Sequence, residues 1–246
     1  MSRANPAIMI TGASRGIGLG VATRLARRGC ALTIAGRNEV QLQAVAGALR
    51  DEGAADVALL AGDILDDDYL NCLVAHHKVR FGRMDGLVTN AGAGSAGAFA
   101  QFHPKRFDKQ IVTNLRSAFV LVQAALPLLR ITAREGSRGA KVVAMASMTG
   151  VYAERELAAY GAAKAGLISL CRSINLEENA NGVQATAVAP GYVNTDMSEF
   201  KHDVLSADDM ITVDDVVEVV DMCLRLSRRA VVTEVLIARS GSALQA

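Results

Sequence analysis

Several features that mark other protein classes are missing from this chain of 246 residues. Its four cysteines, Cys30, Cys72, Cys171 and Cys223, form no C-x-x-C pair, so neither a disulfide framework nor a zinc site is indicated. The formal net charge is +1, with no long run of one sign, so neither nucleic acid nor an anionic membrane is an expected partner. Scattered thiols suit a reducing compartment, and we expect a cytoplasmic protein.

Long apolar runs are also missing. The longest, "AFVLVQAALPLL" (118–129), contains Gln123 and Pro127 and is too short to cross a bilayer, so no membrane association is expected. The first ten residues are too few and too polar for a signal peptide. The hydrophobic content is 51%, which indicates a globular chain and favours self-association.

Short apolar segments alternate with longer segments of helical pattern along the whole chain. Because strands that are apolar throughout are typical of a parallel sheet covered on both faces, the pattern predicts an α/β fold, a doubly wound Rossmann-like sheet of about seven strands. We expect one domain over 1–246. The strands are predicted at 7–11, 31–36, 57–63, 86–92, 141–147, 183–190 and 231–238. The helices are predicted at 16–28, 38–53, 66–82, 104–114, 117–133, 154–180 and 213–227.

A glycine-rich segment, "TGASRGIGLG", joins the first strand to the first helix. Glycine allows a tight turn and close approach of the backbone to a pyrophosphate, and the helix N-terminus supplies unpaired N–H groups. The spacing T-G-x-x-x-G-x-G at this position predicts a dinucleotide site rather than a P-loop, because no G-K-[ST] follows. Its contributing residues are Gly12, Ser14, Arg15, Gly16, Ile17 and Gly18.

Tyr160 and Lys164 lie four residues apart in "AYGAAKAGL", which places both on one face of a helix. They can be a tyrosine and lysine packed at a helix edge, or a phenol whose proton a nearby ammonium makes easier to remove. Ser147 is no hydrolase nucleophile, because "MASMTG" is not G-x-S-x-G. Adjacent His76 and His77 cannot share a helix face, so we predict no metal site.

Together, "TGASRGIG", "NAG" (90–92), Ser147, "YGAAK" and "PGYVNT" (190–195) resemble the short-chain dehydrogenase/reductase family, in its single-domain branch that includes 3-oxoacyl carrier-protein reductases. The resemblance implies a catalytic tetrad of Asn114, Ser147, Tyr160 and Lys164. In it, Tyr160 exchanges a proton with the substrate oxygen, Ser147 holds that oxygen, and Lys164 binds the nicotinamide ribose. Asn114 is expected to interrupt its helix and hold a water.

The same resemblance implies further contacts to the cofactor. They fall on Asp63, Ile64, Asn90, Ala91, Gly92, Pro190, Gly191, Val193 and Thr195, together with Tyr160 and Lys164. Asp63 can equally be a turn or helix cap. The substrate lid is expected at 192–212, and its polar composition suggests an open pocket. The chain lacks the D-G-G tail of many relatives and ends in "IARSGSALQA".

The end of the second strand bears on the choice of cofactor. Arg37 and Asn38 follow "IAG", where an acidic residue usually binds the ribose of NAD. A planar guanidinium from Arg37 or Arg15 suits the extra phosphate of NADP better than a diol, unless both arginines simply face water. NADP(H) is the predicted cofactor, and NAD(H) stays possible.

These residues predict an oxidoreductase that interconverts a ketone and a secondary alcohol, 3-oxoacyl thioester reduction among the options. A non-catalytic nucleotide sensor of the same fold is the alternative. By the resemblance, the chain is expected to form homotetramers or homodimers through the helices near 104–130 and 154–180.

Overall fold

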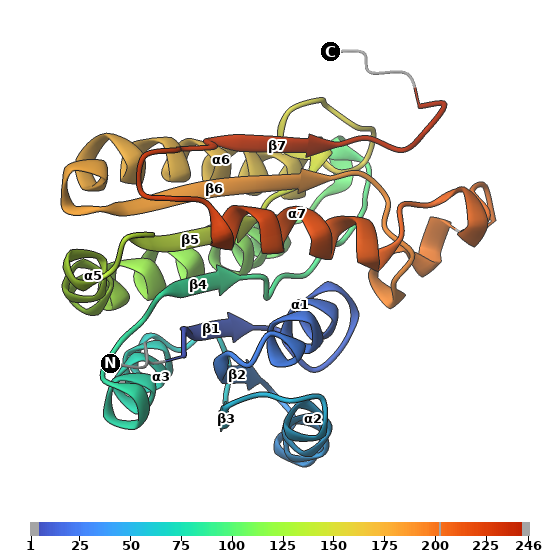
Figure 1. Cartoon of the computed structure of the whole chain (residues 1–246). Coiled ribbons are helices and arrows are strands. Elements are labelled where there is room, and N and C mark those ends of the chain that lie inside the picture. Colours follow the sequence, from blue (N-terminus) through green and yellow to red (C-terminus); the bar gives the residue numbers. More distant parts are fainter. Residues whose placement is uncertain (1–4, 202, 243–246) are drawn as a thin grey trace.

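All seven strands of the chain join one parallel sheet, in the order β3-β2-β1-β4-β5-β6-β7 (Figure 1). The computed structural model describes residues 5–201 and 203–242. The strands are β1 (Ala7–Thr11), β2 (Ala31–Gly36), β3 (Asp56–Ala61), β4 (Gly86–Thr89), β5 (Ala140–Met145), β6 (Val183–Pro190) and β7 (Glu234–Ile237). The predicted α/β fold is confirmed.

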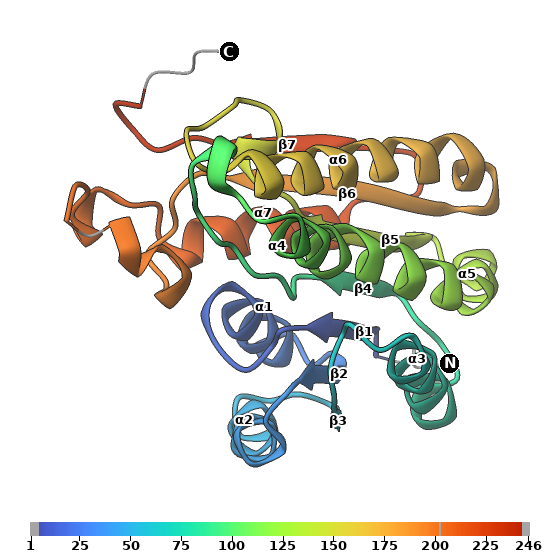
Figure 2. The ribbon, with the colours of Figure 1, turned by 180° about the vertical axis from the view of Figure 1, so that it is seen from behind.

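Helices cover both faces of the sheet. One face carries α1 (Gly16–Arg27), α2 (Glu39–Asp51) and α7 (Val213–Arg225). The opposite face, which Figure 2 shows, carries α3 (Asp67–Phe81), α4 (Pro104–Ile111), α5 (Ser117–Glu135) and α6 (Ala158–Glu178). Successive strands are added on one side of β1 up to β3 and on its other side from β4 onward. Doubly wound folds bind their ligands where the strand order reverses in this way, between β1 and β4.

The two hydrophobic cores follow from the two-residue period of the strands. In β1, Ile8 and Ile10 pack on the side of α1 and α7, whereas Met9 packs on the side of α3 and α5. Because both faces are covered, each strand must be apolar throughout, as the sequence pattern requires.

The region predicted as two helices, at 104–114 and 117–133, is continuous in the structure. A π-helical turn, Val112–Arg116, joins α4 to α5, and α5 runs on to Glu135. The connection to β5 is therefore shorter than the gap between the predicted helix, which ends at 133, and the predicted strand, which begins at 141. The joined segment Pro104–Glu135 has an 18-residue window long and apolar enough to cross a membrane, but 44% of that window is buried in the protein, so this is weak support for a span.

Other boundaries differ from the prediction mainly at the ends of the elements. The strands predicted to end at residues 63, 92 and 147 end two or three residues earlier, because the chain leaves the sheet there to form loops at its carboxyl edge. The helix predicted from 154 begins at Ala158, after a turn at residues 155–156. The last strand covers only four residues, Glu234–Ile237.

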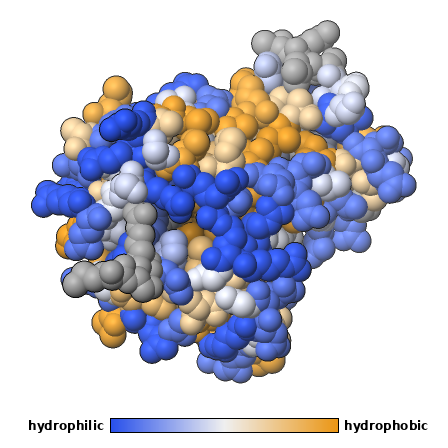
Figure 3. All heavy atoms as spheres, in the orientation of Figure 1, coloured by the Kyte–Doolittle hydropathy of each residue, from blue (hydrophilic) through white to orange (hydrophobic). Residues whose placement is uncertain are grey.

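Strand β7 forms one edge of the sheet, and apolar side chains accompany it on the surface. Figure 3 shows hydrophobic atoms gathered on the upper part of this face, where β7 lies in Figure 1, and hydrophilic atoms below them. Leu236 in β7 and Val231 just before it are both exposed. This edge of the sheet is therefore only partly covered by the chain itself.

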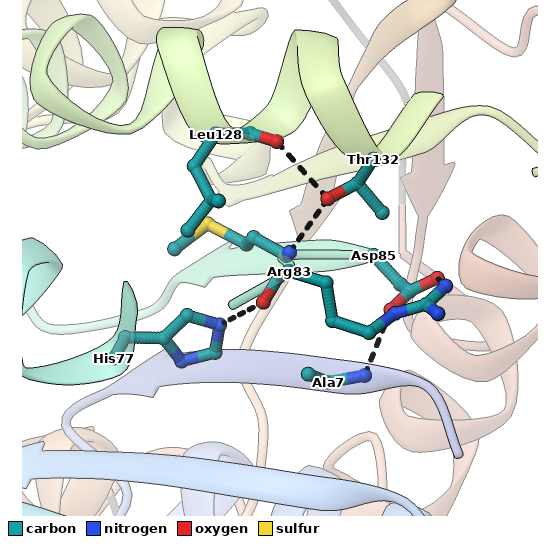
Figure 4. Close-up of polar contacts among 7 residues, drawn as sticks. Ala7, His77, Arg83, Asp85, Leu128 and Thr132 are labelled. Atoms are coloured by element: carbon teal, nitrogen blue, oxygen red, sulfur yellow. Dashed lines mark hydrogen bonds and ion pairs between the residues drawn. The ribbon is translucent and has the colours of Figure 1, made fainter. Parts of the chain in front are cut away.

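A polar cluster lies at the amino ends of β1 and β4, opposite the loops at the carboxyl edge of the sheet (Figure 4). Asp85 accepts hydrogen bonds from the Arg83 guanidinium and the Ala7 backbone N–H, and the Thr132 hydroxyl accepts one from Met84. The buried His77 ring contacts the Thr33 hydroxyl at 2.7 Å and the Arg83 carbonyl at 2.9 Å. These contacts explain His77 without a metal.

We predict that His77 makes the free energy of unfolding depend on pH. Burial lowers the pKa of His77 to about 4, below its ordinary 6.5, so the unfolded chain binds more protons between these values. Stability should fall as the pH decreases from 6.5 towards 4, by at most about 1.4 kcal/mol per pH unit. Urea unfolding at several pH values measures this. His77→Gln should flatten the slope, and His76→Gln, one residue away, should leave it unchanged; equal slopes in all three proteins would show that another group is responsible.

Candidate functional site

A cavity of about 770 Å³ opens at the carboxyl ends of the strands. It is bounded by the loops after β4, β5, β6 and β7, which Figure 1 shows beyond the arrowheads. The sequence-predicted residues that line it are Ile17, Asn90, Gly92, Asn114, Ser147, Tyr160, Lys164, Pro190, Gly191, Val193 and Thr195. Asn114 from the turn between α4 and α5, Ser147 from the end of β5, and Tyr160 and Lys164 from α6 thus share one cavity.

Tyr160 and Lys164 leave the first turns of α6 on the same side. The Lys164 Nζ lies 5.5 Å from the centre of the Tyr160 ring and donates a hydrogen bond of 2.6 Å to the Met145 carbonyl at the end of β5. Ser147 follows β5, and its Oγ accepts from the Thr149 backbone N–H at 3.2 Å. The end of β5 therefore fixes both the serine and the lysine beside the phenol.

Burial dominates the proton equilibria of this pair. It raises the pKa of Tyr160 to about 12, against the opposing effect of a hydrogen bond with the Ser147 side chain. It also lowers the pKa of Lys164 to about 8, because this lysine is only 4% exposed. The sequence led us to expect that Lys164 would lower the pKa of Tyr160; in this structure burial has the larger influence, and it acts in the other direction.

Asn114 lies in the π-helical turn between α4 and α5, at the interruption expected for it. Its side-chain amide donates to the Ala93 carbonyl at 2.8 Å, and its Oδ1 accepts from the Ala93 N–H at 3.2 Å. A Cβ built on Gly92 would lie 2.7 Å from Asn114 Oδ1 and 3.6 Å from Lys164 Nζ. The asparagine, the lysine and the loop after β4 are therefore in close contact, with no room for a side chain at position 92.

The glycine loop is packed directly against the end of β4. Asn90 Nδ2 donates to the carbonyls of Thr11 and Gly12, both at 3.1 Å. A Cβ on Gly18 would lie 2.2 Å from the Gly12 carbonyl oxygen and 2.5 Å from Asn90 Nδ2. Gly12 itself has a φ of 65°, in the left-handed region that favours glycine. These positions require glycine for packing within the protein, in addition to any ligand contact.

Other sequence-predicted residues lie outside this cavity. Ile64 and Ala91 line a small separate cavity beside Asn114 and Lys164. The remaining residues are in the glycine loop or after β2 and β3: Gly12, Ser14, Arg15, Gly16, Gly18, Arg37, Asn38 and Asp63. Three of them, Arg15, Asn38 and Asp63, contact other residues of the chain through their side chains.

Asn38, Asp63 and Arg15 each have a partner within the chain. The Asn38 side chain caps α2 by accepting from the Gln41 N–H, and Asp63 Oδ1 accepts from the Leu65 N–H. Arg15 forms an exposed ion pair of 2.7 Å with Asp196. Arg37 is exposed. The cap anticipated as the alternative for Asp63 is present, and the Asp196 contact of Arg15 is one that the sequence did not indicate.

The segment predicted as a lid, 192–212, is held at both ends. Val193 pairs with Ile211, and the Ile211 N–H donates to the Tyr192 carbonyl while the Asn194 N–H donates to the Ile211 carbonyl, both at 2.9 Å. Two short 3₁₀ helices, Asp196–Lys201 and Ala207–Asp209, lie between these ends; His202 is outside the described residues. The residues of this segment that line the cavity include apolar Met197, Phe200, Val204 and Leu205. The segment therefore forms a partly apolar wall, which its polar overall composition did not indicate.

Among the polar residues that the sequence analysis did not select, Glu154, Tyr192, Lys201 and Arg239 line the cavity. Glu154 accepts a hydrogen bond from the Tyr192 hydroxyl and one of 3.2 Å from Lys201. Tyr192 could have been found from its place in "PGYVNT". The other three come from loops whose positions depend on long-range contacts, and their local sequence carries no signal.

Comparisons with known proteins agree with this geometry. The family model described as short chain dehydrogenase matches residues 6–204. A Streptomyces violaceoruber protein named as a granaticin polyketide synthase ketoacyl reductase is 34% identical over 196 residues, which cover 80% of this chain and 71% of that one. The chain therefore belongs to the short-chain dehydrogenase family, and it is an oxidoreductase of that family.

Two solved structures share both fold and sequence with the chain. The actinorhodin polyketide ketoreductase with NADPH is 26% identical, with a TM-score of 0.85 over 95% of each chain. The 3-oxoacyl-[acyl-carrier protein] reductase from Brucella melitensis in complex with NAD is 28% identical, with a TM-score of 0.85 over 96% of each chain.

We predict that Glu156→Gly stabilises the protein. Among the described residues, Glu156 alone combines a side chain with a positive φ, of 66°, in the loop that leads to Tyr160. Its carbonyl accepts from the Gly97 N–H at 2.9 Å, so the strained backbone joins two walls of the cavity. Relief of this strain should raise the free energy of unfolding by about 1 kcal/mol. Urea unfolding measures it, with Arg155→Gly as the neighbour control; no gain over that control would contradict the prediction.

Proposed function

We propose that the chain is an NADP(H)-dependent oxidoreductase that interconverts a ketone and a secondary alcohol. The observation that carries the proposal is the convergence of Asn114, Ser147, Tyr160 and Lys164 on one cavity. Its size suits a small-molecule substrate together with one end of a dinucleotide. The family relatives named as ketoacyl and 3-oxoacyl reductases support carbonyl reduction, with a 3-oxoacyl thioester as one candidate substrate.

In this proposal Tyr160 is the general acid in reduction and the general base in oxidation. Ser147 and Tyr160 line the same cavity, and the Ser147 side chain opposes the rise in the pKa of Tyr160, so a substrate oxygen held by the serine hydroxyl would also meet the phenol. Lys164 binds the nicotinamide ribose and, as a cation, favours the phenolate. Its pKa of about 8 allows it to exchange protons near neutral pH. Asn114 holds a water that connects Lys164 to solvent.

The residues at the glycine loop fit a dinucleotide. No side chain caps the N-terminus of α1, which leaves the N–H groups of its first turn available to bind a pyrophosphate. Gly16, with a φ of 54°, has only Thr195 side-chain atoms within 4 Å of a built Cβ, which leaves the backbone open to a ligand. When bound, the nicotinamide supplies or accepts the hydride.

The proposed contacts to the cofactor extend along the strand ends. Asp63 and Ile64 would contact the adenine, and Asn90, Ala91 and Gly92 would lie along the adenosine ribose. Pro190, Gly191, Val193 and Thr195 would pass over the nicotinamide. The buried Val193 is already fixed by its pairing with Ile211, which supports a backbone contact to the carboxamide.

We propose NADP(H) over NAD(H) because two arginines lie where the adenosine ribose would be bound. Arg37 follows β2 and is exposed, and Arg15 lies in the glycine loop. The two loops are in contact, since Gln41 Nε2 donates to the Ser14 carbonyl at 3.3 Å. Arg15 would have to leave Asp196 to bind a phosphate. This ion pair is exposed, so the exchange costs little.

We also propose a homodimer or homotetramer. Exposed apolar side chains on α4, α5 and α6, among them Phe107, Phe119, Ile131 and Leu176, lie on the helices expected to form the interface. We further propose a cytoplasmic location and a substrate lid formed by residues 192–212. The whole chain, 1–246, is proposed to be one domain, although residues 1–4, 202 and 243–246 lie outside the described structure.

We predict that Tyr160→Phe abolishes turnover without loss of cofactor binding. The variant removes only the hydroxyl that transfers the proton, which should lower kcat by about 100-fold or more. NADPH oxidation with a panel of ketones measures turnover, and NADPH fluorescence measures binding. An unchanged kcat would refute the acid assignment. If the natural protein binds NADPH but reduces no carbonyl, it is a nucleotide-binding protein instead.

We predict that Arg15→Gln and Arg37→Gln each weaken NADPH binding by about tenfold, because each removes a charge-assisted contact to the phosphate. NADH binding should change less than twofold. Fluorescence titration with both nucleotides measures the ratio. Arg27→Gln, on the same helix as Gly16 but paired with Glu52, is the matched control. Equal losses for NADPH and NADH would contradict the role in cofactor selection.

A further inference from the structure

The side chains that line the cavity carry more positive than negative charge. Glu154 is the single acid among them, whereas the cations are Lys164, Lys201 and Arg239. Lys201 is paired with Glu154 at 3.2 Å, and Lys164 donates to the Met145 carbonyl beside Tyr160. Arg239 therefore adds a positive charge to this wall that the lining residues do not neutralise.

The position of Arg239 is fixed by the sheet and by a turn. β7 pairs with β6, and the Gly191 N–H donates to the Ile237 carbonyl at 2.9 Å, two residues before Arg239. The chain then turns: the N–H and Oγ of Ser242 both donate to the Arg239 carbonyl, at 3.1 and 2.7 Å, and Gly241 has a φ of 73°. This is the geometry of a type II turn. It brings both Arg239 and Ser242 to the cavity that contains Ser147 and Tyr160.

The guanidinium of Arg239 differs from comparable groups in the chain. Within residues 5–201 and 203–242, four arginines are half-buried: Arg24, Arg83, Arg130 and Arg239. The first three form ion pairs with Glu218, Asp85 and Glu178. Arg239 donates only to the carbonyl of its neighbour Ser240, at 3.2 Å, and no described carboxylate lies within 4 Å. A half-buried guanidinium that faces a cavity without an acidic partner is available to bind an anion.

We propose that Arg239 determines substrate specificity by binding an anionic group of the carbonyl substrate. The planar fork of a guanidinium binds carboxylates and phosphates through two parallel hydrogen bonds. The substrate would then be a ketone that carries, away from its reacting carbonyl, a carboxylate or a phosphate. This inference rests on the proposed function, because it assigns the substrate class of the same cavity.

The test compares matched anionic and neutral ligands. One arm uses 3-oxobutanoate, 5-oxohexanoate and 7-oxooctanoate together with their methyl esters. The other arm uses 3-oxobutanoyl pantetheine with and without its terminal phosphate. Binding is measured by calorimetry in the presence of saturating NADP⁺, where no reduction can occur, and kcat and KM are measured separately with NADPH.

Three variants isolate the guanidinium. Arg239→Gln should weaken binding of the preferred anionic ligand, and raise its KM, by about tenfold or more, with less than twofold change for the neutral counterpart. Arg239→Lys should retain part of the preference because it keeps the charge. Arg155→Gln is the control, since Arg155 is exposed and follows the cavity residue Glu154. The arm in which the preference lies identifies the anion as a carboxylate or a phosphate.

Two results would overturn the inference. In one, the natural protein binds anionic and neutral ligands equally well in both arms. In the other, Arg239→Gln or Arg155→Gln weakens both kinds of ligand alike. Failure of the proposed function is distinguishable, because it would leave an Arg239-dependent anion preference in calorimetry without any NADPH oxidation.

Discussion

The side-chain amide of Asn90 connects the two halves of this fold where their strands diverge. It donates to the carbonyls of Thr11 and Gly12, and so ties the end of β4 to the loop that opens α1. Gly12 and Gly18 leave the space that the amide occupies. The position of the glycine loop relative to Asn114, Lys164 and the cavity depends on this contact, because those groups meet the loop that follows Asn90.

A second constraint comes from burial at the end of β5. Burial disfavours both the phenolate of Tyr160 and the ammonium of Lys164, which raises the pKa of the phenol and lowers the pKa of the lysine. The burial that opposes an acidic phenol also strengthens electrostatic interactions inside the cavity, so the protonation of this pair responds to any charge that a ligand brings there.

The features of this structure that could be predicted from the sequence are those determined by residues close together in the chain. Apolar strands, a glycine loop at the first strand end, and Tyr160 and Lys164 at helical spacing follow from neighbouring residues, and the sheet forms as predicted. The π-helical turn at Asn114 was expected through the family resemblance, although the two helices it joins were predicted as separate. The pairing of Arg15 with Asp196, 181 residues away, and the place of Arg239 in the cavity depend on contacts that no local pattern encodes.

The pairing of Val193 with Ile211 has a consequence for how this protein could change. It anchors both ends of the intervening segment to the sheet's carboxyl edge, so the seventeen residues between them, 194–210, form a loop with fixed ends. Since the entropic cost of closing a loop grows only slowly with its length, such a loop can be exchanged or lengthened with little effect on the rest of the fold. New substrate ranges could therefore arise by replacing one short stretch of chain, while the residues that carry the chemistry stay where they are.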